Sequence, residues 1–142
     1  MIWVGIDTGT HTGLAVWDGR VFTKLETLPI HRALEMVARL HEEHGAQLAV
    51  VFEDARKRRW YGRAGREKLQ GAGSIKRDAA IWQAFCEDRG IAFTMVAPRP
   101  GLTKWSADYF ARVTGYTRRC SEHARDAALL VFGRGARLQM DR

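Results

Sequence analysis

The stretch MIWVGIDTGTHTGLAVWDG, residues 1–19, decides the fold expected for this chain. Two short apolar runs, IWVGID at 2–7 and LAVW at 14–17, flank the turn residues TGTHTG. An Asp-Gly pair then indicates a second tight turn before the alternating VFTKLETL at 21–28. The three runs predict an antiparallel meander whose first strand ends in a lone acid, Asp7.

This stretch alone leaves the role of Asp7 open. An acid at a strand end can start a turn, face a nucleotide phosphate across a Gly-rich loop, or bind a metal ion. Gly9 and Gly13 are expected to let the backbone turn tightly into the second strand. Residues farther along the chain must decide among the three roles.

The remaining hydrophobic pattern predicts an alternation of helices and strands. The expected elements are a helix at 30–44, a Val-rich central strand at 47–54, a helix at 74–90, a strand at 91–98, and helices at 104–115 and 121–133. The last helix is expected to be N-capped by Ser121. The aromatic residues expected to pack in the interior are Trp3, Trp17, Trp82, Phe85 and Phe93. Right-handed crossovers place the first and fourth strands side by side, which predicts an α/β fold with a mixed five-stranded sheet and helices on both faces.

Composition indicates one ordinary domain spanning residues 1–142. A hydrophobic fraction of 46% excludes a disordered chain. No apolar run approaches the roughly 20 residues that cross a membrane, and the N-terminus lacks the basic region of a secretory signal. We therefore expect a cytoplasmic protein with no membrane partner. Cys86 and Cys120, without metal-like spacing, are expected to be reduced, packed thiols.

The formal net charge of +7 is concentrated in residues 54–77, which contain nine basic and two acidic residues. A cluster of one sign favours a polyanion such as nucleic acid, although an ordinary solvated loop is the alternative. Residues 54–74, rich in glycine, are expected to form a basic DNA-binding loop within the domain. Trp60 and Tyr61 can stack on unpaired bases. The expected DNA-binding residues are Arg56, Lys57, Arg58, Arg59, Trp60, Tyr61, Arg63, Arg66, Lys68, Lys76 and Arg77.

Acids end the two strands expected to be central neighbours. Asp7 closes the first, and either Glu53 or Asp54 closes the fourth. Adjacent residues face opposite sides of a strand, so only one of the two can join Asp7, and we favour Glu53. Neighbouring carboxylates repel each other unless a cation lies between them. His123 and Asp126 share a face of the last helix, and if that face meets Asp7 they complete the site.

Three carboxylates with at most one nitrogen ligand suit Mg²⁺, or Mn²⁺ in its place, better than zinc. Two such ions in one site suit phosphoryl transfer, with Asp7 bridging them. The alternative for His123 is a hydrogen bond to the backbone at the helix start.

The motifs GIDTGTHTG, VVFED and HARDAALL together resemble the RuvC-type Holliday junction resolvases of the RNase H-like superfamily. The resemblance implies an RNase H-like fold and a crossover junction endodeoxyribonuclease. Asp7, Glu53, His123 and Asp126 would be its metal ligands, and Lys104 the lysine that approaches DNA or the scissile phosphate. It also implies a homodimer that cuts branched DNA, typically a four-way junction, leaving a 5′ phosphate and a 3′ hydroxyl. RNA–DNA hybrid remains an alternative substrate.

The same opening stretch also resembles the first phosphate loop of sugar kinases and actin-like ATPases, through its Asp-x-Gly-Thr motif. A chain of 142 residues has no room for the second such domain that closes over ATP in that group. The alternative functions are therefore a truncated ATP-binding module or a non-catalytic nucleic-acid-binding module.

Overall fold

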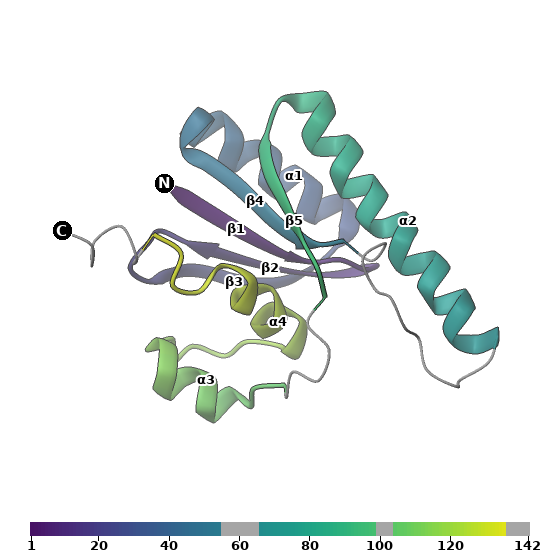
Figure 1. Cartoon of the computed structure of the whole chain (residues 1–142). Helices are drawn as coiled ribbons and strands as arrows, with labels where there is room; N and C mark the ends of the chain where they lie inside the picture. The colour runs from purple at the N-terminus through teal and green to yellow at the C-terminus, as the bar shows by residue number, and fades with distance from the viewer. Residues whose placement is uncertain (55–65, 99–103, 136–142) are drawn as a thin grey trace.

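The chain forms one mixed sheet of five strands in a computed structural model that describes residues 1–54, 66–98 and 104–135, without the side chains of 66–72 and 75 (Figure 1). The strands are β1 (Ile2–Asp7), β2 (His11–Trp17), β3 (Phe22–Pro29), β4 (Leu48–Glu53) and β5 (Ala92–Val96). Their order is β3-β2-β1-β4-β5, with the first three antiparallel and the β1–β4 and β4–β5 pairs parallel. The predicted fold class is confirmed, and this order is consistent with an RNase H-like fold.

Helices cover both faces of the sheet, as predicted (Figure 1). They are α1 (Ile30–His44), α2 (Arg66–Arg89), α3 (Ala107–Thr114) and α4 (Glu122–Val131), with a short 3-10 turn, η1 (Gly45–Gln47), between α1 and β4. Residues of α1 and α2 pack on one face, and residues of α3 and α4 pack on the other. The central strands β1 and β4 therefore lie between two apolar layers.

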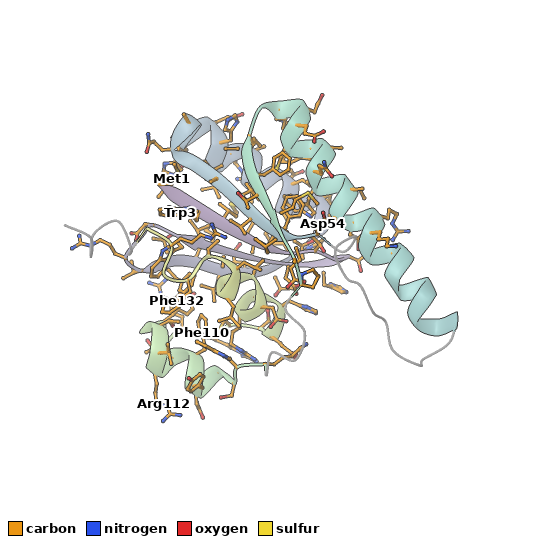
Figure 2. The ribbon with its side chains drawn as sticks, viewed as in Figure 1. Met1, Trp3, Asp54, Phe110, Arg112 and Phe132 are labelled. Atoms are coloured by element: carbon orange, nitrogen blue, oxygen red, sulfur yellow. The ribbon has the colours of Figure 1, made fainter. Side chains whose placement is uncertain are left out.

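The aromatic side chains expected in the interior do contribute to these layers. Trp82, which belongs to α2, is fully buried in the core that α1 and α2 form with the sheet, and Trp17 is buried on the α4 side. Trp3, Phe85 and Phe93 are partly buried and pack against the same two cores. Figure 2 labels Phe110 and Phe132, which join α3 and the end of α4 to the sheet. The centroids of their rings lie 5.7 and 6.0 Å from the centroid of the Phe22 ring on β3.

Both cysteines are free. Burial raises the pKa of the Cys86 thiol to about 12, so it remains an uncharged packing group at neutral pH. The prediction of reduced, packed thiols is confirmed, because Cys86 is buried and the partly buried Cys120 packs against the core beneath α3 and α4.

Two predicted helix boundaries are wrong. Helix α2 begins at Arg66, not Ser74, so residues 66–73 belong to a helix and not to the expected loop. Its two glycines weaken helix propensity locally, but a glycine in a long helix costs only about 1 kcal/mol. Helix α3 begins at Ala107, after the N-cap Ser106, and Lys104 therefore precedes the helix.

Candidate metal centre

Helix α4 lies directly against β1 and β2 because two glycines leave room for its backbone (Figure 1). A Cβ atom built on Gly5 would lie 2.1 Å from the carbonyl oxygen of Ala127. One built on Gly13 would lie 2.0 Å from the carbonyl oxygen of His123. Real side chains do not approach backbone oxygens so closely, so glycine at both positions fixes how near α4 comes to the sheet.

Gly13 therefore has a different role from the predicted one. It lies inside β2, opposite Asp7 in the register, and not in the turn. Gly9 does lie in the turn, where its carbonyl accepts a hydrogen bond from the buried Thr12 hydroxyl at 2.7 Å. A glycine inside a strand often marks a close approach of another backbone, so Gly13 was a signal in the sequence for this helix contact.

The first turn of α4 is fixed at the sheet by Ser121. Its hydroxyl accepts a hydrogen bond from the backbone N–H of Ala124 at 3.1 Å, which confirms the predicted N-cap. The same hydroxyl contacts the Thr27 hydroxyl on β3. This anchor sets both the axial position and the rotation of α4, and thereby the direction of the side chains that follow.

Three of the predicted ligands meet at the carboxyl end of β1. One ligand atom from each of Asp7, His123 and Asp126 lies within 4.8 Å of the other two. His123 Nδ1 is 3.0 Å from Asp7 Oδ2, although the two residues are 116 positions apart. The group contains two carboxylates and one imidazole, is open to solvent on one side, and can hold a metal ion.

Asp7 does not act as a turn residue. Among the described residues its side chain is hydrogen-bonded to His123, and no turn amide is bonded to it. Asp18 shows the contrast, because its Oδ1 accepts hydrogen bonds from the amides of Arg20 and Val21 at 2.8 and 2.9 Å. The turn role suggested by the sequence belongs to Asp18, and Asp7 faces α4.

The register of the sheet favours Glu53 over Asp54 as the neighbour of Asp7. Ile6 is opposite Phe52, so the next pair along these parallel strands is Asp7 and Glu53. Side-chain alternation puts Glu53 on the same face as Val51, which packs in the α3–α4 core. Asp54 (labelled in Figure 2) is buried just beyond the strand, where its amide donates to the Val96 carbonyl. Glu53 is exposed and stands outside the group of three ligand atoms.

Lys104 reaches the group from the segment before α3. Its Nζ lies 2.5 Å from Glu122 Oε1 and 3.8 Å from Asp126 Oδ2. The hydrogen bond to Glu122 raises the pKa of the Lys104 ammonium and lowers the pKa of the Glu122 carboxyl. The ammonium therefore stays charged beside the carboxylates. The pair of Glu122 and Lys104 was not predicted, because no local pattern in the sequence links an acid to a lysine 18 positions earlier.

Burial raises the pKa of Asp7, and the charge of Asp126 adds to this, while the hydrogen bond from His123 opposes it. Burial also raises the pKa of Asp126, against the opposing effect of the Lys104 charge. The fold therefore disfavours the anionic form of both carboxyl groups relative to water. A bound cation would relieve this cost, so the residues present fit a divalent metal ion.

A raised pKa also predicts how stability depends on pH. A carboxyl whose pKa is higher in the folded state stabilises the fold below its ordinary value of 3.8 and loses that contribution as pH rises through the raised value. We expect metal-free Asp126→Asn to have a higher free energy of unfolding, and a higher Tm, than the wild type at pH 7. Urea titrations without metal should show the difference shrinking as pH falls. A difference that grows toward acid pH would contradict the assignment.

Most of the predicted DNA-binding residues fall outside the described residues: Arg56, Lys57, Arg58, Arg59, Trp60, Tyr61 and Arg63. Arg66 and Lys68 lie in the first turn of α2, where only the backbone is described. Lys76 and Arg77 are exposed on α2, and Arg77 Nε is 3.7 Å from Asp78 Oδ1. The DNA-binding role of this segment therefore stays a prediction.

No protein-family model matches the chain, and a search of curated proteins found no significant match. Across the described ranges, none of the helices combines the length and the apolar character that a membrane span requires. The function must therefore be argued from the sheet order and from the group of Asp7, His123 and Asp126.

Proposed function

We propose that this chain is a metal-dependent endonuclease that cuts branched DNA, of the same type as the RuvC Holliday junction resolvases. The observation that supports this most is the convergence of Asp7, His123 and Asp126 from β1 and α4 within 4.8 Å, on a sheet of RNase H-like order. Two carboxylates facing one imidazole bind a hard cation well. The same anionic group would repel a bare phosphate, which argues against a simple phosphate loop.

The ligands of the proposed centre are Asp7, Asp126 and His123, with Glu53 from the neighbouring strand. They suit Mg²⁺, with Mn²⁺ as a substitute, because they offer mainly oxygen and no thiolate. When bound, two such ions would supply an activated water and stabilise the leaving 3′ oxygen, so that hydrolysis leaves a 5′ phosphate and a 3′ hydroxyl. Asp7 stands between the end of β4 and α4, so its carboxylate would hold metal together with ligands from both elements.

Lys104 adds a fixed positive charge beside these ligands. Its ammonium lies 3.8 Å from Asp126 Oδ2, and we propose that it donates a hydrogen bond to a non-bridging oxygen of the scissile phosphate. Its exposed position leaves it accessible to a large substrate such as DNA. We therefore include Lys104 among the catalytic residues of the proposed nuclease, with Asp7, Glu53, His123 and Asp126.

The preference for branched DNA and the homodimer rest on the resemblance to the resolvases and on the basic segment at 54–77. Two coordinated nicks across a four-way junction require two active sites, which two copies of this chain would supply. Nine basic side chains in that segment provide the charge that phosphate binding needs.

The test is a cleavage assay with the full chain on a synthetic four-way junction, a linear duplex of the same sequence and an RNA–DNA hybrid. We expect Mg²⁺- or Mn²⁺-dependent nicks near the branch point, little cutting of the duplex or the hybrid, and none in EDTA. Junction affinity, measured in Ca²⁺, should fall steeply with salt. Absence of cutting on all three substrates in Mn²⁺ would refute the nuclease, whereas preferred cutting of the hybrid would refute the junction specificity.

A further inference from the structure

Lys104 belongs to no helix or strand, yet two residues of α4 fix it beside the proposed metal ligands. Glu122 binds its side chain, with Oε1 2.5 Å from Nζ. The ammonium is then 3.8 Å from Asp126, which follows Glu122 by one turn on the same helix. The helix that carries Asp126 thus also determines where the lysine charge lies.

Arg125 fixes the backbone beside Lys104. Its Nε donates to the carbonyl oxygen of Trp105 at 3.1 Å, and its Nη1 donates to the carbonyl oxygen of Cys120 at 2.8 Å. The guanidinium is planar and partly buried, so it joins two segments to α4 in one rigid geometry. The ring of Trp105 also contacts Tyr109 and Phe110 on α3.

A lysine without such contacts would be a poor catalytic group. Its side chain loses rotamer entropy when it is fixed, and 67% of the Lys104 side chain is exposed to solvent. Small displacements of a reacting or charge-stabilising group reduce rates strongly. Glu122 is not among the three residues of the candidate metal group, and its carboxylate is bound to Lys104.

We propose that Glu122 and Arg125 are positioning residues that hold the Lys104 ammonium beside Asp126, Glu122 through the side chain and Arg125 through the main chain. This inference rests on the proposed nuclease function for its catalytic consequence. Its structural content, a lysine held in place by two residues of α4, does not depend on cleavage.

A double-mutant cycle tests the catalytic consequence. Glu122→Gln should lower kcat on the junction about tenfold, equivalent to about 1.4 kcal/mol in the barrier, with KM and Mn²⁺ affinity by calorimetry nearly unchanged. Lys104→Met should lower kcat at least as much, and the double variant should be no slower than Lys104→Met alone, because Glu122 acts through the lysine. Glu35→Gln is the matched control, since Glu35 pairs with Arg32 on α1, and should leave kcat unchanged.

NMR of the lysine ammonium groups tests the structural content without any cleavage. We expect slow proton exchange at the Lys104 Nζ of the wild type, assigned by its loss in Lys104→Met, and fast exchange in Glu122→Gln. Arg125→Lys, which keeps the charge but lacks the planar fork, should also speed this exchange while the thermal transition remains cooperative. Equal exchange in wild type and Glu122→Gln, or additive losses of kcat, would overturn the proposal. A wild type that cuts nothing yet protects Lys104 would refute the nuclease and leave the positioning intact.

Discussion

Gly5→Ala is expected to destabilise the protein strongly, by about 4 kcal/mol or more. The added Cβ would meet the Ala127 carbonyl oxygen at 2.1 Å, and that oxygen belongs to the backbone of α4 and has no side-chain freedom to move away. Relief requires α4 to lift from β1, which opens the core around Val131 and Val51. Urea unfolding followed by circular dichroism measures the loss directly.

Gly13→Ala should behave similarly, because its Cβ would lie 2.0 Å from the His123 carbonyl oxygen. It has the further effect of displacing the helix turn that carries His123, so residual folded protein should bind Mn²⁺ weakly.

The matched control is Gly73→Ala in α2, where an added Cβ meets nothing within 4 Å in the described part of the chain. There alanine should stabilise the helix by up to about 1 kcal/mol. If Gly5→Ala and Gly73→Ala unfold at the same urea concentration, α4 does not approach the sheet as closely as described.

Asp7→Asn is expected to reduce cleavage of the junction about a thousandfold or more, a rise of roughly 4 kcal/mol in the barrier. Asparagine keeps the shape of the side chain but removes the negative charge that the proposed ions require. Calorimetry should show weakened Mn²⁺ binding. Without metal, the variant should melt at or above the wild-type temperature, because burial and the Asp126 charge already disfavour the Asp7 anion.

Asp88→Asn serves as its control. Asp88 is exposed near the end of α2, and the same chemical change there should alter neither cleavage nor Mn²⁺ binding. Full activity in Asp7→Asn would contradict the proposed centre, whereas loss of activity together with unfolding would point to a structural role for Asp7.

Local patterns predicted much of the architecture, because strand and helix periodicity reflect burial of one face. IWVGID and QLAVVFED are apolar throughout or nearly so, and both became central strands covered on two sides. The start of α2 was predicted wrongly. Gly71 and Gly73 favour a loop by propensity, yet the helix extends through them. Propensity is a weak preference that the surrounding structure overrides.

The sequence by itself determined the strands and the acids that end them, because these depend on residues near one another in the chain. It also determined that the candidate ligands are carboxylates with one imidazole and no thiolate. Only the tertiary structure decided that α4 approaches β1 and β2 at Gly5 and Gly13, which brings His123 to 3.0 Å from Asp7. It also decided that Glu122 and Arg125 hold the Lys104 segment. Such contacts join residues far apart in sequence, and their geometry depends on how two backbones pack, for which no local pattern exists.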